Sequence, residues 1–385
     1  MKKILILIIT LITLTGCWNN SPLQDRVIVL GIGIDKIDDT HIKLCIQVSK
    51  SLSGNNENSK NTSNSVTVLC DSGETIFEAI RNLVKESNRK PYYGHIQLFV
   101  IGENIARDNI NNIVDFFERD HESRLDSYVV VTKGVTAEEV LRATSTLDDI
   151  PVSHIRDIID NHTASGKIRK TTFFELLREI NYPEYNCSLG VISRRAAYKK
   201  AENISQLEIQ GTAVFKSVKL AGFLNGIETR GFSFINDEIE SCILKVPNPQ
   251  DKDEKISIEV IRNKTKINVN IENNIPTFTI NIESQGTIGG QIGKGNLITR
   301  NNIETIEKAT EEVLNNEVSK ALYKIQKEYK SDIIGFAEIT NKKYPNYWKE
   351  NEDNWNQIFV KAPIEIKINF EIKRHGLINK TTESQ

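Results

Sequence analysis

The chain has 385 residues, of which 39% are apolar and 26% are charged. These fractions lie near the averages of globular proteins and exclude a wholly disordered or collagen-like chain, and the length predicts two to three domains. The formal net charge of -2 argues against a protein that binds nucleic acid by neutralising phosphate groups, so we expect no nucleic-acid partner.

The first residues have the layout of an export signal. Lys2 and Lys3 precede a short apolar run at residues 4–14, and the string Leu-Thr-Gly-Cys occupies residues 14–17. The run is shorter than the roughly 20 residues that cross a bilayer, and the string resembles the bacterial lipoprotein box. We therefore expect residues 1–16 to be a cleaved lipoprotein signal peptide and Cys17 to carry a lipid anchor. The alternative is a buried N-terminal helix with an incidental cysteine.

Strand and helix patterns alternate in residues 17–204, the first predicted module. Apolar runs predict strands at 27–34, 42–48, 96–101 and 128–132. Helical spacing of apolar residues predicts helices at 76–84, 110–117, 137–143, 153–159 and 173–180. Asp71 is the candidate cap of the first helix, and the Ser- and Asn-rich residues 51–65 predict a loop. This alternation is typical of an α/β layer.

Residues 205–385, the second predicted module, have a different pattern. A hairpin is predicted from the runs at 207–215 and 220–224. Alternation of apolar and polar residues predicts further strands near 256–260, 267–271, 278–282 and 364–372. A long amphipathic helix from about 303 to 329 would cover their apolar face. The predicted fold class is α+β and multi-domain: a mixed α/β N-terminal module followed by a largely antiparallel sheet packed on a long helix.

Four cysteines follow Cys17, namely Cys45, Cys70, Cys187 and Cys242. Their spacing fits neither a C-x-x-C pair nor a zinc site. Because Cys45 and Cys70 lie in strand-like runs, where small buried thiols are common, we expect unbridged structural cysteines. A Cys45–Cys70 bridge, which export would permit, is the alternative.

The motifs that would carry catalysis are incomplete. Residues 31–36 (GIGIDK) begin like a dinucleotide fingerprint but lack the third glycine, and residues 290–295 (GQIGKG) lack the Ser or Thr of a P-loop. The histidines are scattered, and no nucleophile lies near a base in the sequence. We interpret the ionisable residues 119–122 (RDHE) as ion pairing at a helix end. The sequence therefore predicts no enzyme, no cofactor and no metal.

A set of ordered strings resembles the Ger(x)C family of spore germination lipoproteins over nearly the whole chain. The strings are Gly16-Cys17-Trp18, 29–35 (VLGIGID), 90–95 (KPYYGH), 116–120 (FFERD), 211–216 (GTAVFK), 228–231 (ETRG), 332–336 (DIIGF), Trp348, Asp353, Trp355 and 374–376 (RHG). Residues 19–21 (NNS) depart from the family pattern, which has acidic and basic residues after Cys-Trp. This departure affects only the short segment that follows the expected lipid anchor.

The resemblance implies the C subunit of a nutrient germinant receptor, a lipid-anchored and non-catalytic protein. Such a subunit would lie on the outer face of the spore inner membrane and dock on membrane-embedded A and B subunits to support the germinant response. The resemblance also implies three α/β domains, so the second module would divide again near residues 244–255. Matched motif residues of unknown role are Asp35, Gly94, His95, Arg119, Asp120, Gly211, Phe215, Arg230, Asp332, Gly335, Trp348 and Trp355.

Two functions of other classes stay open at this point. A solute-binding lipoprotein of a transporter would have two doubly wound lobes around a cleft. An anchored cell-wall hydrolase would bring carboxylates or metal ligands together from distant parts of the chain. A deep pocket that gathers titratable groups would distinguish either from a receptor subunit.

Overall fold

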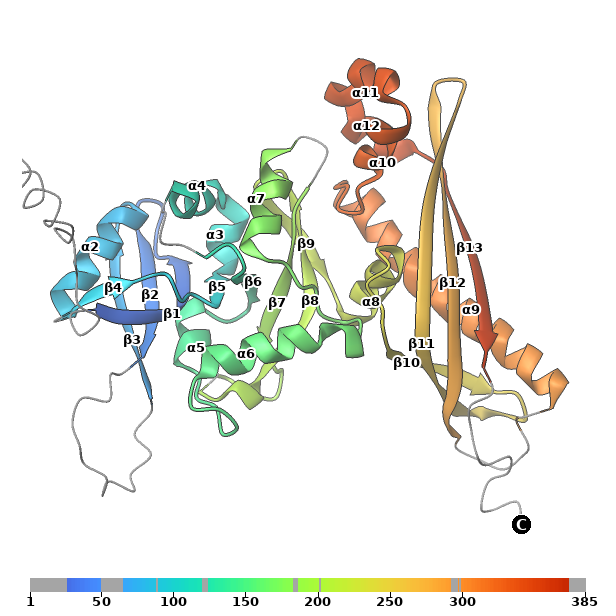
Figure 1. The fold of residues 1–385 in the computed structure, drawn as a ribbon, viewed down its shortest axis with the longest axis horizontal. Helices are drawn as coiled ribbons and strands as arrows, with labels where there is room; N and C mark the ends of the chain where they lie inside the picture. Colours follow the sequence, from blue (N-terminus) through green and yellow to red (C-terminus); the bar gives the residue numbers. More distant parts are fainter. Residues whose placement is uncertain are drawn as a thin grey trace, which may run out of the picture.

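The computed structural model describes residues 26–49, 65–87, 89–119, 124–182, 186–200, 202–291, 297 and 299–373. These residues form two sheets, each with its own helices, which follow one another along the longest axis of the molecule (Figure 1). The predicted α+β, multi-domain fold class is confirmed. Within these ranges, no helix has both the length and the apolar character required to cross a membrane.

The first sheet has nine strands in the order β3-β2-β1-β5-β6-β7-β8-β9, and a short β4 also pairs with β1. Strands β1, β5, β6 and β7 are parallel to one another, whereas β2 and β3 on one side and β8 and β9 on the other are antiparallel. The strands are β1 (Arg26–Lys36), β2 (Ile42–Ser49), β3 (Val66–Gly73), β4 (Lys90–Tyr92), β5 (Leu98–Ile101), β6 (Tyr128–Lys133), β7 (Ser188–Arg194), β8 (Leu207–Lys216) and β9 (Lys219–Leu224).

Helices cover both faces of this sheet, as the sequence alternation predicts (Figure 1). One face carries α2 (Ile76–Glu86), α3 (Glu103–Asp108), α4 (Asn111–Arg119) and α7 (Phe173–Asn181), and the other carries α5 (Ala137–Arg142) and α6 (Pro151–Asp160). Each helix turns an apolar stripe toward the sheet. In α2 the stripe is Ile76, Ala79 and Leu83, all buried.

The predicted cap of α2 is wrong. Asp71 lies inside β3, and the N-cap is Thr75, whose hydroxyl accepts a hydrogen bond of 3.1 Å from the backbone N–H of Glu78. Strand β3 continues to Gly73, so the helix cannot begin until the chain has left the sheet. A hydroxyl directly before the first helical residue then satisfies one of the unpaired N–H groups of the first turn.

The predicted hairpin at 207–224 is confirmed, but it does not belong to a separate sheet. Strand β8 pairs with β7 and β9 pairs with β8, so the first sheet extends beyond residue 204. The hairpin is shared by two cores: Ala213 and Phe215 pack in that of the first module, whereas Val214 and Leu224 pack in that of the second. Alternate side chains of a strand point to opposite faces, which explains this division.

The second sheet has four strands in the order β10-β11-β12-β13. Its strands are β10 (Cys242–Asn248), β11 (Asp251–Glu272), β12 (Ile275–Gln291) and β13 (Ile364–Ile372). The runs predicted as separate strands at 256–260 and 267–271 are one strand, β11, because its pairing with β12 passes through a bulge near Arg262 without ending. Pairing is antiparallel except between β12 and β13, which are parallel.

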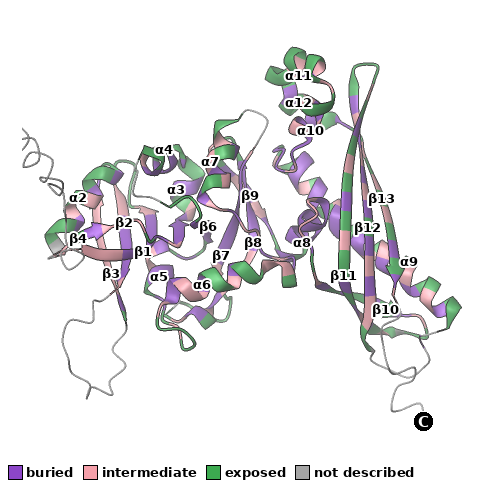
Figure 2. Ribbon diagram, in the orientation of Figure 1, coloured by how far each residue is buried: buried purple, intermediate pink, exposed green. Residues whose placement is uncertain are grey.

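The predicted long helix packs on this sheet. It consists of α9 (Arg300–Leu322) and a π-helical segment η4 (Tyr323–Glu328), and its buried side chains include Ile306, Leu314 and Val318. The remaining helices of the module are α8 (Gly226–Ile235), α10 (Phe336–Lys343), α11 (Pro345–Asn351) and α12 (Trp355–Lys361). Burial is continuous from α8 and α9 into the facing side of the sheet (Figure 2).

Helix α9 also closes part of the edge of the second sheet. The carboxylates of Glu311 and Glu307 accept hydrogen bonds from the backbone N–H groups of Phe370 (3.0 Å) and Ile372 (2.8 Å) in the edge strand β13. Backbone donors that would otherwise face outward from the sheet are thereby satisfied within the chain.

Candidate functional site

The described motif residues do not gather in one place: some lie in the first module, some in the second module, and some at the junction between the two modules. Cys17 and Asp120 lie outside the described residues.

Asp35 fixes the position of helix α5. Its carboxylate accepts hydrogen bonds from the N–H groups of Ala137 (2.9 Å) and Glu138 (3.1 Å), the first residues of α5. Burial raises the pKa of Asp35, and these two N–H donors oppose that rise. A carboxylate at a helix N-terminus is a stabilising arrangement, so Asp35 has a structural role.

Gly94, His95 and Arg119 do not meet Asp35 or form a common site. A Cβ atom at Gly94 would lie 2.4 Å from the hydroxyl of Tyr92, so a larger residue there would displace the end of the Tyr92 side chain. The exposed His95 stacks edge-on against the ring of Tyr92, with a centroid distance of 5.8 Å. Arg119 pairs with Asp115 at 2.9 Å on the surface of α4, whereas the other residues of the predicted ion-pairing cluster, 120–122, lie outside the described residues.

Arg230 forms a buried ion pair that joins α8 to α9. Its guanidinium donates to both carboxylate oxygens of Glu317, with 2.8 Å from Nε to Oε2, and Nη1 donates to the carbonyl of Ile243 at 2.9 Å. The helices approach closely here, because a Cβ atom on Gly231 would lie 2.4 Å from the carbonyl oxygen of Glu317. The ion pair therefore fixes the rotation of α8 about its own axis relative to α9.

Asp332 organises the turn that leads into α10. Its carboxylate accepts from the N–H groups of Gly335 (3.0 Å), Phe336 (3.1 Å) and Ala337 (2.8 Å) and from Nε1 of Trp355 (3.1 Å). Burial raises the pKa of Asp332 against the effect of these donors. Gly335 has a φ of 89°, which glycine adopts without strain.

The two tryptophans of the motif set are core residues. Trp348 and Trp355 are 3% and 6% exposed, and their rings meet edge-to-face at 5.2 Å. They hold α11 and α12 beside Asp332.

Gly211 and Phe215 lie in β8 on the other side of the junction. Phe215 is fully buried, and its carbonyl accepts a hydrogen bond from the hydroxyl of Ser331, next to Asp332. Gly211 has a φ of 109°. Nearby, the hydroxyl of Tyr329 donates to the carbonyl of Phe223 in β9 at 2.9 Å. The segment after η4 is thus tied directly to the last hairpin of the first sheet.

A second buried charge cluster joins the modules through Arg169. Its guanidinium pairs with Glu238, which follows α8, lies 3.6 Å from Glu179 of α7, and donates from Nε to the hydroxyl of Ser188 at 3.1 Å. Burial raises the pKa of Glu179 to about 7, although Arg169 and the N–H of Ser188 act in the opposite direction. Sequence reasoning missed this cluster, because its members come from separate segments.

Glu317 was also missed, although the sequence carries a signal for it. It follows Leu314 by three residues and precedes Ala321 by four, so a helical period places it on the buried stripe of α9. A carboxylate at such a position needs a buried cation, and Arg230 provides it.

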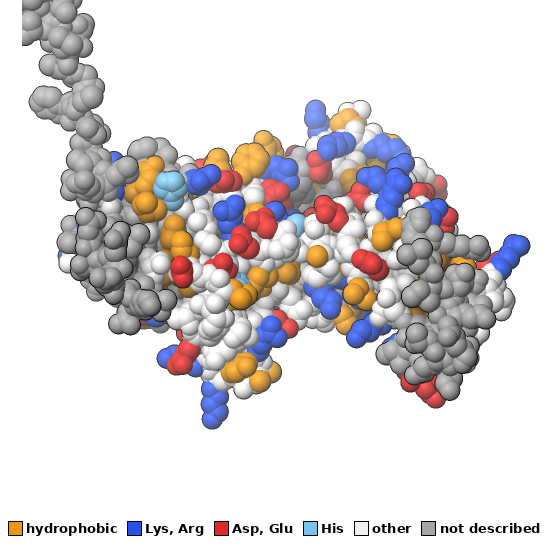
Figure 3. Space-filling model, turned by 60° about the horizontal axis from the view of Figure 1, so that its bottom comes forward, with side chains coloured by type: hydrophobic (Ala, Val, Ile, Leu, Met, Phe, Trp, Pro, Cys, Tyr) orange, Lys and Arg blue, Asp and Glu red, His pale blue; other side chains and the backbone are white. Residues whose placement is uncertain are grey.

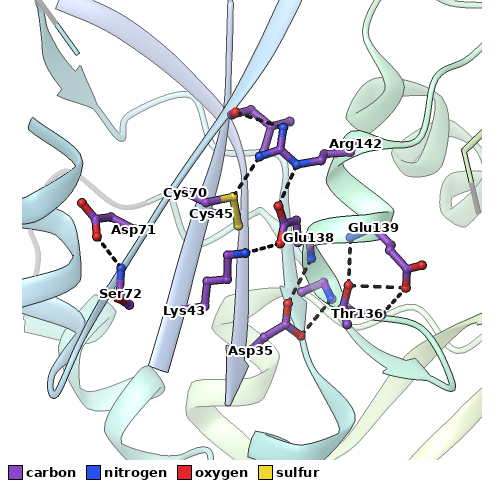
Figure 4. The surroundings of a disulfide bond; sticks show 12 residues. Asp35, Lys43, Cys45, Cys70, Asp71, Ser72, Thr136, Glu138, Glu139 and Arg142 are labelled. Atoms are coloured by element: carbon purple, nitrogen blue, oxygen red, sulfur yellow. Dashed lines mark hydrogen bonds and ion pairs between the residues drawn. A yellow bond between two sulfur atoms is a disulfide. The ribbon is translucent and has the colours of Figure 1, made fainter. Parts of the chain in front are cut away.

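Cys45 and Cys70 form a disulfide, which overturns the expectation that both are unbridged. They are directly opposite each other in the antiparallel pair β2–β3, with their Cα atoms 4.1 Å apart. Figure 4 shows Glu138 of α5 beside the bridge, paired with Lys43 and with Arg142. Strand register, which the sequence pattern left undefined, brings the two sulfurs together. Cys187 and Cys242 are buried and unbridged.

The cluster of Ser145, Asp148 and His154 resembles a hydrolytic triad only in composition. Both Oγ of Ser145 (2.9 Å) and Oδ2 of Asp148 (2.7 Å) contact the same ring nitrogen of His154, Nδ1. A triad needs the two partners on opposite nitrogens. In addition, Oγ of Ser145 accepts hydrogen bonds from the backbone of Leu147 and Asp148, as in a turn.

An open groove of about 790 Å³ lies between α2, α4 and β4. Phe77, Ile80, Tyr93, Ile113 and Phe116 contribute apolar lining. Some charged residues on its rim are paired, Lys36 with Asp39 and Asp108 and Arg119 with Asp115. Glu74, Arg81 and Lys90 also line the groove. The groove thus lacks the convergent, desolvated carboxylates of a hydrolase.

Charged side chains of both signs are interspersed along the face of the molecule shown in Figure 3, in keeping with the small net charge.

Two family models match the chain, one in each half. The model described as "Spore germination protein N-terminal domain" matches residues 19–194, and that described as "Spore germination B3/ GerAC like, C-terminal" matches residues 210–376. Residues 195–209 lie between the two matches.

Curated relatives match over almost their whole length. Spore germination protein KC of Bacillus subtilis is 26% identical, with 99% of this chain and 97% of the relative covered. Spore germination protein B3 of the same organism is also 26% identical, with 98% and 99% covered. The crystal structure of the GerBC protein has the same fold, with a TM-score of 0.56 and 22% identity over 89% of this chain and 96% of that one.

Proposed function

Because this chain belongs to the Ger(x)C family of spore germination proteins, we propose that it is the lipid-anchored, non-catalytic C subunit of a nutrient germinant receptor. It would lie on the outer face of the spore inner membrane and dock on the A and B subunits within that membrane. The observation that carries the proposal is the match of both halves, in order, to germination proteins over nearly their full length.

The anchor in this proposal is a thioether-linked diacylglyceryl group on Cys17. Two acyl chains hold a protein to a bilayer durably, whereas one chain gives only reversible binding. The export signal and the cysteine at its end support this anchor.

The role without catalysis is supported by what the motif residues do. Asp35 caps a helix, Arg230 joins two helices, and Asp332 orders a turn at the junction. Other contacts join the two modules, namely the ion pair of Arg169 with Glu238 and the hydrogen bonds of Ser331 and Tyr329 to the last hairpin of the first sheet, so displacement of one module by a membrane subunit would move the other. We propose that the protein stabilises or transmits the germinant-induced state in this way, through contacts that differ between the resting and activated receptor.

The transporter alternative has less support. A solute-binding lipoprotein of the kind considered above would have two doubly wound lobes, whereas the second sheet here is antiparallel through β10, β11 and β12 and carries its helices on one face.

The test is a strain that carries Cys17→Ala, with Cys187→Ala as the matched control because Cys187 is a buried, unbridged cysteine in the body. We expect Cys17→Ala to release the protein from the membrane fraction and impair nutrient germination, and the control to do neither. Unchanged membrane retention of Cys17→Ala would contradict the anchor. Absence of the A and B subunits after affinity purification of the protein from detergent-solubilised spore membranes would contradict the docking.

A further inference from the structure

The outward side of helix α2 combines apolar and basic side chains. Phe77 and Val84 are 55% and 43% exposed, and the side chains of Arg81 and Lys85 are exposed as well. Residues at this spacing share one side of a helix, because positions three, four and seven residues apart lie above one another. Together these four side chains form the α2 face, which is opposite the stripe that packs on the sheet.

Lys90 of β4 adds a third cation beside the α2 face. It is exposed and lines the groove together with Phe77 and Arg81. Among the described side chains, Arg81, Lys85 and Lys90 have no ion pair, and Lys85 donates to the neutral amide of Asn82 at 2.8 Å. These three cations are therefore available to an anionic partner.

The acidic residues at the start of α2 do not pair with these cations. The carboxylate of Glu78 accepts a hydrogen bond of 2.9 Å from the backbone N–H of Glu74, at the N-terminal turn of the helix. Negative charge is favoured at that end of a helix, so Glu78 has a local partner.

The exposed ring and one of the cations lie side by side. The guanidinium carbon of Arg81 is 5.0 Å from the centroid of the Phe77 ring, and the ring of Phe116 lies 6.4 Å behind it. Such a pair fits the boundary between lipid headgroups and acyl chains, because the ring can enter the apolar region while the guanidinium meets phosphate groups.

The α2 face lies within reach of the proposed anchor. Arg26, the first described residue, pairs with Lys90 in the contact between β1 and β4. Positions 17 and 26 differ by nine, so a lipid on Cys17 lies no more than about 30–32 Å from Arg26 whatever path the chain takes. In Figure 1, α2 lies at the end of the molecule opposite the second sheet. The anchor would therefore hold this end of the molecule near the bilayer.

We propose that the α2 face and Lys90 form a contact surface for a bilayer that contains anionic lipid. Phe77 and Val84 insert at the level of the headgroups, and Arg81, Lys85 and Lys90 lie at lipid phosphate groups. The inference deepens the proposed membrane location and rests on it for the choice of a bilayer as the partner. The contact turns one defined face of the first module toward the membrane, so the anchored protein has a fixed orientation.

The test is flotation of the exported chain 17–385, with Cys17→Ser, on vesicles of phosphatidylcholine alone and of phosphatidylcholine mixed with phosphatidylglycerol. We expect binding to the mixed vesicles that weakens as salt is added, and much weaker binding to the neutral ones. The assay contains neither the lipid anchor nor a receptor subunit. Its failure would therefore leave the proposed anchoring and docking intact, and their failure would leave its result intact.

The charge variant is Arg81→Gln/Lys85→Gln/Lys90→Gln. We expect it to weaken binding to the mixed vesicles on the order of 100-fold, because each cation near an anionic surface contributes roughly fivefold. The binding that remains should depend less on salt.

The control for the charge variant is Lys245→Gln/Lys255→Gln/Lys266→Gln. It removes the same charge from exposed positions of the second sheet and should leave the binding unchanged.

The apolar variant is Phe77→Ser/Val84→Ser, which we expect to weaken binding by about tenfold with the circular dichroism unchanged. Phe174→Ser on α7 is its control, because Phe174 is 56% exposed and does not line the groove. It should bind the mixed vesicles like the parent chain.

Four outcomes would overturn the inference. The parent chain could bind neutral and mixed vesicles equally, or the second-sheet control could lose as much binding as the charge variant. Absence of vesicle binding, together with a dimer that Phe77→Ser dissociates in sedimentation, would assign the α2 face to a second copy. Absence of vesicle binding, together with protection of α2 from hydrogen exchange only when the membrane subunits are present, would assign it to a partner protein.

Discussion

The Cys45–Cys70 disulfide gives the most quantitative prediction for the first module. The two residues are 25 positions apart, and the bridge ties the edge strand β3 to β2. In the chain-entropy model, closing a loop of this length lowers the conformational entropy of the unfolded chain and raises its free energy by about 3.5 kcal/mol at 25 °C. Breaking the bridge should lower the free energy of unfolding of this module by about that amount.

The assay is urea unfolding followed by far-UV circular dichroism, with and without dithiothreitol, and with the thiols counted after reduction. We expect reduction to lower the unfolding midpoint of the parent chain and to leave a Cys45→Ala/Cys70→Ala variant unaffected. Cys187→Ala is the control, since it removes a buried sulfur without breaking a crosslink. If the counted thiols show full reduction while the parent's midpoint stays constant, the reasoning is refuted.

Three further predictions concern the contact between α8 and α9 and the buried carboxyl of Glu179. Arg230→Met should lower the free energy of unfolding by about 3–5 kcal/mol, because it leaves the Glu317 carboxylate buried without its cation. The double variant Arg230→Met/Glu317→Met should recover much of this loss, and equal instability of the two variants would contradict the reasoning. The Glu179 carboxyl has a pKa of about 7 in the folded chain and about 4.5 in the unfolded chain, so the folded chain binds more protons between these two pH values. The free energy of unfolding should therefore fall by about 3 kcal/mol as the pH rises from below 4.5 to above 7. Glu179→Gln should flatten that part of a stability-against-pH curve, whereas an unchanged slope would assign it to other groups. Gly231→Ala should cost about 1–3 kcal/mol in urea unfolding, since the new Cβ meets the α9 backbone, and a neutral result would mean that α8 can move away.

The sequence predicted those elements whose apolar periodicity is local. The strand at 27–34, the helices of the first module other than the short α3, and the long helix near 303–329 were found in this way. The pattern could not show that two runs join into β11, because a bulge interrupts the alternation without ending the strand. It also could not place the hairpin at 207–224, since pairing with β7 depends on tertiary contacts.

The site was less accessible from the sequence than the fold. The resemblance marked Arg230 and Asp332, but their roles depend on partners about 87 and 23 residues away, Glu317 and Trp355. The disulfide required the register of β2 against β3, which the sequence pattern left undefined. Whether such residues form a contact depends on how the fold places them in space, which residue type alone does not predict.

The two glutamates of α9 that bond to β13 have a consequence for crowded surroundings. A strand from another molecule could pair with β13 at Phe370 and Ile372 only after displacing the carboxylates of Glu311 and Glu307. The displaced negative charges would then lie beside the backbone of the added strand. Many copies confined to a small area could therefore collide at this rim without polymerising through it.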